Sequence, residues 1–230
     1  MRLSVIIPVL NERHSLPSML EALATLDTHE VIVVDGGSTD GTQEYLRQQK
    51  HARVIETQPG RGNQMNAGAR MATGDVLLFL HSDCVLPGTA PAQLREALTD
   101  QKTVAGCFLV RFAERSHALR LVAWGINRRT LWTRTATGDQ ALFMRRSAYD
   151  LTGGFPSWPL FEDVEMVSRI KRQGRFVVLA KPVTISARRW TTLGVWRTTL
   201  MMYALRLGYH AGISPFKLKQ WFADIRIQAH

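Results

Sequence analysis

The feature that most constrains the fold is the alternation of short apolar runs with helical segments in the first third of the chain. The apolar runs are rich in aliphatic and β-branched residues, and each ends at polar residues, glycine or proline. Strands that alternate with helices at this spacing predict a parallel α/β sheet that is buried on both faces. The predicted strands cover residues 3–10, 31–35, 53–57 and 76–81, and the predicted helices cover residues 15–26, 42–50 and 63–72.

The second half of the chain is less regular but still mixes strands with helices. Residues 104–112, 141–144 and 176–180 have the composition of strands. Residues 161–173 are typical of a helix, which Gly174 ends.

The tail, residues 188–230, predicts two helices, the second of which begins at Pro215 and is rich in lysine and aromatic residues. Four large side chains of the first helix share one stripe. We interpret the stripe as a cover for the main domain, and the alternative is that the basic, aromatic tail docks peripherally on anionic membrane. The stripe consists of Trp196, Leu200, Tyr203 and Leu207.

Composition excludes several classes of protein. A content of 45% hydrophobic and 21% charged residues, without repeats, excludes a disordered chain. No apolar run approaches the roughly 20 residues that span a bilayer, and the N-terminus lacks a cleavable signal pattern. Cys84 and Cys107 form neither a CxxC nor a zinc spacing, so we expect reduced thiols and a cytoplasmic protein, with peripheral contact at the inner face of the membrane as the alternative.

The net charge of +10 indicates an anionic partner. The basic residues are spread along the chain without a basic arm or an RNA-stacking motif, so we expect no nucleic acid. A phosphate-bearing small molecule or an anionic membrane surface fits the charge better.

Polar clusters follow the four predicted N-terminal strands. Because ligands of open α/β sheets bind at the carboxyl ends of the strands, these clusters should meet at one rim. The clusters are Asn11 and Glu12, residues 35–38, residues 60–63, and residues 81–83.

The glycine-rich clusters have two readings each. The segment 34–42 matches neither a dinucleotide fingerprint nor a P-loop, and it forms either a strand, turn and helix cap or a site where Asp35 binds a base or ribose. The segment 60–75 forms either a capped surface helix or a helix N-terminus that binds a diphosphate with help from Arg61.

His81 and Asp83 lie two residues apart, so in an extended segment their side chains point the same way. They could hold a divalent cation, Mg²⁺ or Mn²⁺, with Asp83 as the oxygen ligand and His81 as the nitrogen ligand. The alternative is that Asp83 caps the next loop while His81 bonds to the backbone.

Three carboxylates open the predicted helix after residue 161. Acids in a first turn interact favourably with the helix dipole, and Glu165 can pair with Arg169 one turn later. Helical geometry places Asp163 on the apolar face with Glu162 on its flank, whereas Glu165 points to the opposite side. Desolvation there raises the pKa of Asp163 and suits a general base.

An ordered set of motifs spans residues 4–190. The set consists of SVIIPVLNE, VIVVDGGSTDGT, the segment 61–75, FLHSD, GGFPSWPLFEDVEM and RRW. This set resembles the inverting family 2 glycosyltransferases of the GT-A fold. The tail, with residues 196–199 and 212–215, resembles a short soluble subgroup labelled arsenosugar-biosynthesis glycosyltransferases.

The resemblance implies a fold and a division of the chain. The fold is α/β, Rossmann-like, with a mixed, mostly parallel central sheet flanked by helices and followed by C-terminal helices. Residues 1–187 form the glycosyltransferase domain, with residues 1–110 as the nucleotide-sugar-binding half and residues 111–187 as the acceptor half. Residues 188–230 form a helical extension packed on that domain.

The resemblance also implies roles for individual residues. Asp163 matches the base of the family's ED pair, with Glu162 beside it, and Asp83 matches the final acid of the DxD element, which holds metal and diphosphate. His81, which stands where the family has the first acid of that element, is expected from its spacing to Asp83 to be the second metal ligand. The residues expected to contact the donor are Pro8, Asn11, Glu12, Asp35, Gly37, Ser38, Arg61, Asn66, Ser82, Asp83, Asp139, Gln140, Arg189 and Trp190.

The sequence departs from the family pattern at three places. His81 replaces the first acid of the DxD element, and Gly36 replaces the usual acid after Asp35. The QxxRW element is reduced to residues 186–190. The last departure argues against a polymerising enzyme. We therefore expect a non-processive hexosyltransferase that uses a divalent cation and moves a sugar, with inversion, from a nucleoside-diphosphate sugar to a hydroxyl of a small or lipid-linked acceptor.

Two alternatives remain open. The first is a sugar-nucleotide-binding protein without catalytic activity, because the DxD element is eroded. The second is a sugar nucleotidyltransferase, although the glycine-rich N-terminal loop of that class is missing.

Overall fold

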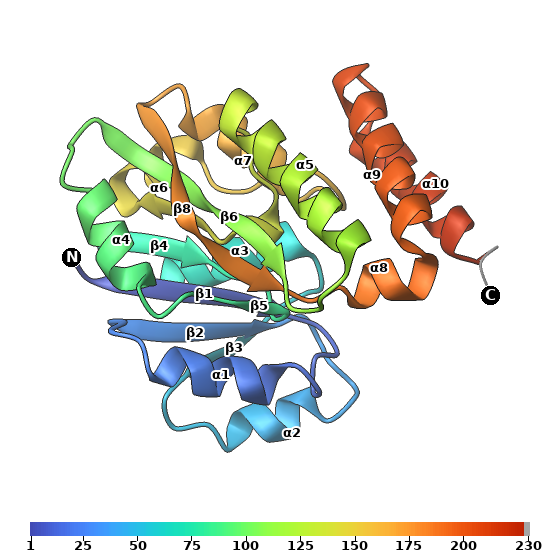
Figure 1. Ribbon diagram of the computed structural model, residues 1–230. Helices are drawn as coiled ribbons and strands as arrows, with labels where there is room; N and C mark the ends of the chain where they lie inside the picture. The colour runs from blue at the N-terminus through green and yellow to red at the C-terminus, as the bar shows by residue number, and fades with distance from the viewer. Residues whose placement is uncertain (228–230) are drawn as a thin grey trace.

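The computed structural model describes residues 1–227, apart from the side chains of Arg189 and of residues 222–227. Within that range the strands form one eight-stranded sheet in the order β3-β2-β1-β4-β7-β6-β8-β5 (Figure 1). The strands are β1 (Leu3–Val9), β2 (Glu30–Asp35), β3 (Arg53–Glu56), β4 (Val76–Phe79), β5 (Cys84–Val85), β6 (Thr103–Phe112), β7 (Leu142–Arg145) and β8 (Arg175–Ile185).

The sheet is mixed and mostly parallel, which confirms the predicted fold class. Strands β3, β2, β1 and β4 are parallel neighbours, and β6 pairs with β8 in parallel. Strand β7 runs antiparallel between β4 and β6, and β5 runs antiparallel to β8. All seven residues of β1 are buried, as expected for a strand covered on both faces.

Helices cover both faces of the sheet. Buried side chains of α1 and α4, such as Leu16 and Leu94, belong to one core cluster, and those of α3 and α7, such as Met65 and Met166, belong to the other. The helices preceding the tail are α1 (Leu16–Ala24), α2 (Thr42–Arg47), α3 (Arg61–Met71), α4 (Ala90–Ala97), α5 (His117–Thr133), α6 (Arg146–Thr152) and α7 (Glu162–Ile170), with a short 3-10 turn at Gly138–Gln140.

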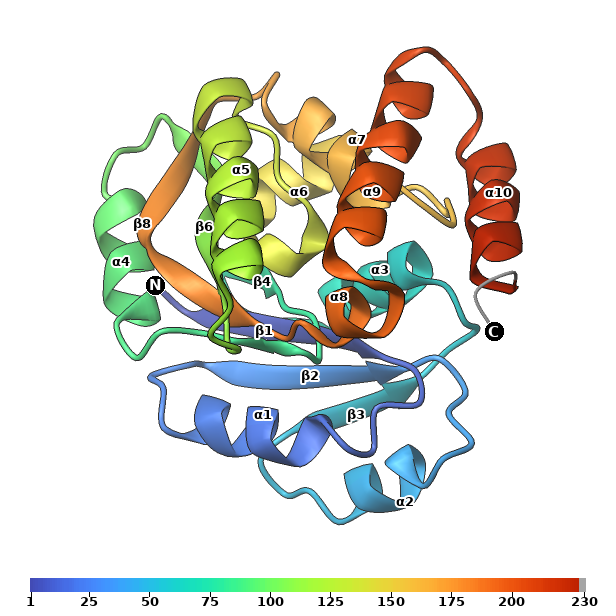
Figure 2. The same cartoon turned by 45° about the vertical axis from the view of Figure 1, so that its right-hand side comes forward.

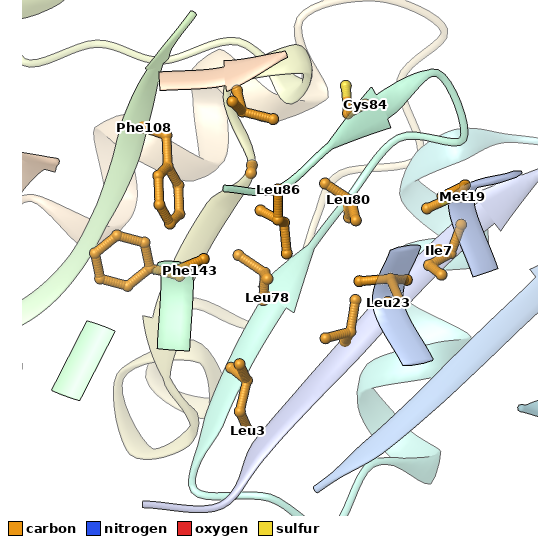
Figure 3. Close-up of a cluster of buried hydrophobic side chains, with 14 of the residues drawn as sticks. Leu3, Ile7, Met19, Leu23, Leu78, Leu80, Cys84, Leu86, Phe108 and Phe143 are labelled. Carbon is orange, nitrogen blue, oxygen red and sulfur yellow. The ribbon is translucent and has the colours of Figure 1, made fainter. Parts of the chain in front are cut away.

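The first core cluster lies between the sheet and helices α1, α4 and α5. Figure 3 shows Leu78 beside Phe143, with Met19 and Leu23 of α1 further along the cluster. The rings of Phe108 and Phe143 meet edge to face, with centroids 6.1 Å apart. This packing joins β7 to β6, so the antiparallel strand is held by side chains as well as by its ladder.

The early strands begin and end within about two residues of the predicted positions, and the later elements differ more. Strand β8 is longer than predicted, and helices α4, α5 and α6 were not predicted. The predicted boundary at residue 110 falls inside β6, so the two expected halves share one continuous sheet.

Three helices, α8 (Arg188–Leu193), α9 (Val195–His210) and α10 (Pro215–Ile227), follow the sheet. In Figures 1 and 2 they lie at one side of the molecule, with α9 beside α5. Met201 and Leu205 of α9 form a small core with Leu218 of α10, and Phe161 and Leu160 pack against it. The extension is therefore attached to the loop that precedes α7.

The interpretation of the α9 stripe as a cover for the domain was wrong. Trp196, Leu200, Tyr203 and Leu207 are all exposed, by 57%, 70%, 47% and 70%. The opposite face of the helix is buried instead, through Thr198, Met201 and Leu205. The buried positions contact α10 and the loop before α7, so the larger side chains face outward.

Within residues 1–227 no helix combines the length and the apolarity that crossing a bilayer requires. Cys84 and Cys107 are both buried and free of disulfide bonds, as predicted. Burial raises the pKa of the Cys107 thiol to about 12, which makes it unreactive near neutral pH.

Gly106 tests the close packing of the sheet. A Cβ at this position would overlap the carbonyl oxygen of Val177 and the ring of Phe143. Gly106→Ala should lower the free energy of unfolding by about 1–3 kcal/mol, measured by urea denaturation. Gly88→Ala is the control, since no atom lies within 4 Å of its added Cβ. Equal midpoints for the two variants would contradict this packing.

Candidate active site

Loops from distant parts of the chain meet at the carboxyl ends of the strands. The amide of Asn11, after β1, donates to Ser38 Oγ at 2.8 Å, and the amide of Thr39, after β2, donates to Asn11 Oδ1 at 2.8 Å. Asn11 adopts a left-handed backbone conformation with φ of 55°. The first two polar clusters therefore form one hydrogen-bonded unit, as their position on a parallel sheet predicts.

Asp35 fixes the turn after β2. It is fully buried and accepts hydrogen bonds from Ser38 Oγ, from Gln43 Nε2 and from the amides of Gly37 and Ser38, at 2.5 to 3.0 Å. Burial acts to raise the pKa of Asp35, but these hydrogen bonds outweigh it and hold the pKa below its ordinary value. These contacts show that the segment forms a strand followed by a hydrogen-bonded turn, and contact of Asp35 with a donor stays a prediction.

Gln64 is a site residue that sequence reasoning missed. Its side-chain amide donates to the carbonyl oxygens of Val9 at 2.7 Å and Val34 at 2.9 Å, the ends of β1 and β2. Gly36 lies against this side chain, where a Cβ would be only 3.0 Å from Nε2. Gln64 ties α3 to both strands, and Gly36 leaves room for it in place of the family's second acid.

The reduced RRW element lies beside the first cluster. Arg188 Nη2 pairs with Glu12 Oε1 at 3.4 Å, and Ser15 Oγ donates to Glu12 Oε2 at 2.5 Å. Trp190 packs edge to face on Phe112, with ring centroids 5.6 Å apart. The side chain of Arg189 lies outside the described part of the chain.

The central feature of the site is the meeting of three loops at Gly138. The Gly138 amide donates to Asp163 Oδ2 at 2.5 Å. The His81 ring packs so closely that a Cβ at Gly138 would overlap Nε2. The neighbouring loops also touch, since Cys84 Sγ lies 3.5 Å from Asp83 Oδ1 and 3.7 Å from the carbonyl oxygen of Asp139. The structure therefore brings His81 and the predicted base, Asp163, to the same glycine, with Asp83 two residues along the chain from His81.

The first turn of α7 holds a buried carboxyl, Glu162, next to a half-buried one, Asp163. Glu162 is 2% exposed and pairs with Arg61 Nη1 at 3.4 Å, so it is the more buried of the two acids, although helical geometry had placed it on the flank. Asp163 also accepts a hydrogen bond from the Val164 amide at 2.7 Å. The predicted Glu165–Arg169 ion pair is confirmed at 2.8 Å.

Burial raises the pKa of Asp163 to about 7, and the charge of Glu162 adds to the rise. The hydrogen bond from Gly138 and the charge of Arg61 act in the opposite direction. A carboxyl whose pKa lies near neutrality can both accept and release a proton at physiological pH.

Phe161 holds the backbone that presents these acids. Its φ of 65° is left-handed, which is strained for an aromatic residue. Its ring stacks on the ring of Tyr209 of α9, with centroids 4.8 Å apart. Tyr209 also donates to Glu165 Oε2 at 3.4 Å. The C-terminal extension thereby stabilises the turn from which Asp163 projects.

Two of the predicted donor contacts have internal partners in this structure. The amide of Gln140 is buried and bonds to Phe108 O and Thr130 Oγ1, both at 3.1 Å. Asn66 Oδ1 accepts from Tyr149 Oη and from the Phe155 amide, each at 2.8 Å. These side chains position loops, and their contact with a donor stays a prediction.

The remaining predicted residues lie along the same rim. Pro8 is buried in β1 just beyond its pairing with β4, and Ser82 is buried beside His81. Gly37 is in the turn that Asp35 holds, and Thr137 Oγ1 donates to Asp139 Oδ1 at 2.5 Å. Their contacts with a donor stay predictions.

Two arginines that sequence reasoning missed bring positive charge to the site. Arg129 of α5 contacts Gln140 Oε1 at 3.5 Å, and its buried Nε has no hydrogen-bond partner among the described residues. Arg206 of α9 donates to Thr135 Oγ1 at 3.0 Å. Burial lowers the pKa of Arg206 to about 10 and Arg129 adds to the fall, whereas Asp163 and Asp139 raise it. Only the packing of α5 and α9 could have indicated these two residues.

The side chains near Gly138 fit a divalent cation that a substrate helps to bind. In the described chain, no three His, Cys, Asp or Glu side chains form a ready metal site. Asp83 offers a carboxylate and His81 an imidazole. Such a pair suits Mg²⁺ or Mn²⁺, which commonly bind one or two protein ligands together with phosphate oxygens of the substrate.

The raised pKa of Asp163 predicts an unusual dependence of stability on pH. The folded protein keeps this proton up to a pKa of about 7, whereas an unfolded aspartate releases it near 3.8, so stability falls as pH rises through that window. Asp163→Asn, which keeps an acceptor for Gly138, should be more stable than wild type at pH 8 by about 1–3 kcal/mol. The difference should disappear below pH 4. If the difference in free energy of unfolding between the two proteins were the same at every pH, a desolvated Asp163 would be rejected.

Comparison with solved structures supports the fold. A mannosyltransferase from Pyrobaculum calidifontis, solved with GDP-Man and Mn²⁺, superposes with a TM-score of 0.68 at 22% identity, over 91% of this chain and 64% of that one. The S. aureus protein TarS, solved with UDP, superposes with a TM-score of 0.66 at 20% identity, over 81% of this chain and 60% of that one. Both likenesses show a GT-A architecture.

Comparison with curated sequences points to the same family. The glycosyltransferase AglE of Haloferax volcanii is 37% identical over 91 residues, which are 35% of this chain and 30% of that protein. A PGL/p-HBAD biosynthesis glycosyltransferase of Mycobacterium bovis is 40% identical over 88 residues, 35% of this chain and 34% of that protein. The chain thus spans about a third of the length of the curated relatives it matches.

The family model described as glycosyl transferase family 2 matches residues 4–154, which is more than half of the chain. The matched residues include β1, β2, β4 and the loops of His81 and Gly138, whereas Asp163 lies beyond them. The chain belongs to glycosyl transferase family 2.

Proposed function

We propose that this protein transfers one sugar at a time from a nucleoside-diphosphate sugar to an acceptor hydroxyl, with inversion at the anomeric carbon. The observation that carries the proposal is the meeting of Asp163, His81 and the 81–84 loop around Gly138. A carboxyl with a raised pKa beside a candidate cation site provides both a base and a place for a leaving diphosphate.

Asp163 is the proposed general base. As the acceptor oxygen bonds to the anomeric carbon, the bond from that carbon to the diphosphate breaks and the acceptor proton passes to the Asp163 carboxylate. The Gly138 and Val164 amides donate to its two oxygens and so fix their directions. Glu162, paired with Arg61, keeps a negative charge beside Asp163 and favours proton uptake.

The nucleoside and diphosphate are proposed to bind along the rim from Asn11 to Arg61. Relatives in structure have been solved with UDP, with UDP-GlcNAc and with GDP-Man, which supports a nucleotide-sugar donor here. Arg61 opens α3, where a guanidinium and free helix amides suit phosphate oxygens. Glu12 and Asp35 lie at the ends of the neighbouring strands and are the proposed nucleoside contacts.

Asp83 and His81 would hold a divalent cation, Mg²⁺ or Mn²⁺. When bound, such an ion neutralises charge on a diphosphate leaving group. Arg129 and Arg206 contribute further positive charge from the α5 and α9 side of the site.

The reduced RRW element supports a non-processive enzyme, since Arg188 and Trp190 are engaged with Glu12 and Phe112. The proposed acceptor is a hydroxyl on a small or lipid-linked molecule. A cytoplasmic location at the inner face of a membrane is part of the proposal, and the two buried cysteines, which form no disulfide bond, support it.

The role of Asp163 is tested by Asp163→Asn. Loss of the base should reduce sugar transfer by about 10²–10⁴-fold while donor binding remains, measured by product formation and by thermal shift with nucleoside diphosphates. Glu165→Gln is the matched control, since Glu165 opens the same helix but pairs with Arg169. Near-wild-type transfer by folded Asp163→Asn would exclude the proposed base. Donor binding by wild type without transfer or hydrolysis would favour the binding-protein alternative.

The role of His81 is tested by two substitutions. His81→Ala should raise the concentration of Mn²⁺ needed for half-maximal transfer, whereas His81→Asp should largely preserve it, because a carboxylate replaces the lost ligand. Metal titrations of the three proteins provide the measurement. Identical titrations would remove His81 from the cation site.

A further inference from the structure

The outer faces of α5 and α9 carry large apolar side chains that face solvent. Trp132 is 75% exposed and Trp124 is 62% exposed, in addition to the exposed stripe on α9. Single exposed apolar residues are ordinary, but neighbouring helices that both expose such side chains mark an interaction site. We define the α5–α9 surface by Leu121, Trp124, Leu131, Trp132, Trp196, Leu200, Tyr203 and Leu207.

The two stripes belong to one continuous surface. Along α5 the exposed positions recur every three or four residues, and the same is true along α9. Figure 2 shows the two helices side by side. They touch where Tyr203 Oη would lie 3.6 Å from a Cβ at Gly125. The stripes therefore flank a shared helix contact.

Positive charge accompanies the aromatic side chains. Neither α5 nor α9 contains an Asp or Glu residue. The Arg128 guanidinium lies over the ring of Trp132 at 4.7 Å and within 5.9 Å of the ring of Trp124. Amphipathic helices that lie in a bilayer interface combine indoles at the headgroup level with basic side chains that attract anionic lipid.

A basic cleft adjoins the same surface. Its volume is about 750 Å³, and it lies between the end of β6 and the first half of α5. Arg111, Arg115 and Arg120 line it together with Trp124, which belongs also to the α5–α9 surface. Its acid, Glu114, accepts the Ala187 amide at 3.0 and 3.1 Å. Three guanidiniums in a cleft of this size suit lipid phosphate groups.

We propose that the α5–α9 surface docks the protein peripherally on an anionic membrane, with its indoles among the headgroups and its guanidiniums on lipid phosphates. A second copy of the chain is a poorer occupant. In a two-fold dimer this surface would face itself, which would bring Arg120 and Arg128 of both copies together without acids from α5 or α9.

Docking of this kind would place the site next to the bilayer. The inner faces of the same helices reach the site through Arg129, Arg206 and Tyr209. Delivery of a lipid-linked acceptor to Asp163 rests on the proposed function. Docking itself does not depend on it, so a binding measurement without donor or acceptor separates the two proposals.

The test is sedimentation of the full chain with vesicles of phosphatidylcholine alone or with about 30% phosphatidylglycerol. Wild type should sediment with the anionic vesicles. About 0.5 M salt should release it without unfolding it, since screening weakens surface electrostatics. Trp132→Ser combined with Leu207→Ser should weaken the apparent affinity at least about tenfold. Leu151→Ser is the matched control, because Leu151 is 78% exposed on α6, outside this surface.

Three results would overturn the proposal. The first is absence of sedimentation with anionic vesicles, and the second is equal sedimentation with neutral vesicles. The third is equal loss of binding in Leu151→Ser and in the double variant. Sedimentation velocity gives an independent readout, since a stable dimer that only the double variant dissociates would assign the surface to a second copy and reject the membrane.

Discussion

The candidate site depends on one close approach, at Gly138. Its amide donates to Asp163 Oδ2, and the absence of a side chain leaves room for the His81 ring against this turn. A side chain at this position would push the His81 ring away from the turn that holds Asp163. The hydrogen bond also lowers the pKa of Asp163 against the larger effect of burial, so one glycine influences both the geometry and the protonation of the site.

The elements around this point are held by buried polar contacts. Gln64 ties α3 to the ends of β1 and β2, and Gln140 ties the Gly138 turn to β6 and α5. Such buried amides are costly unless they are fully paired, so each fixes a single arrangement of its loop. The left-handed backbone at Phe161, supported by the stacked Tyr209, has the same effect on the turn before Asp163.

Helices α5 and α9 have two faces with different chemistry. Their inner faces supply Arg129 and Arg206 to the site, and burial together with the charge of Arg129 lowers the pKa of Arg206. Their outer faces expose indoles and leucines with arginines between them. Positive charge on both faces is consistent with the net charge of +10, which the composition alone could not divide between a phosphate-bearing substrate and an anionic surface.

Much of the fold was determined by the sequence by itself. Apolar periodicity located β1 to β4 and α1 to α3, and the polar residues that follow each strand indicated the rim, because parallel strands end at a common edge. The resemblance in ordered motifs identified the family, and helical geometry placed Asp163 among apolar neighbours. Local patterns suffice for these features because they depend on residues only a few positions apart.

Only the tertiary structure decided which distant groups meet. Packing between segments far apart in the chain decided the antiparallel direction of β7 and the burial of Glu162 against Arg61. It also decided the bonds from Gln64 to the strand ends and the outward stripe of α9. Periodicity shows that a helix has an apolar face, but α9 has large apolar residues on more than one side. Which side is buried was settled by the shape of the partner surfaces, a property that no local pattern contains.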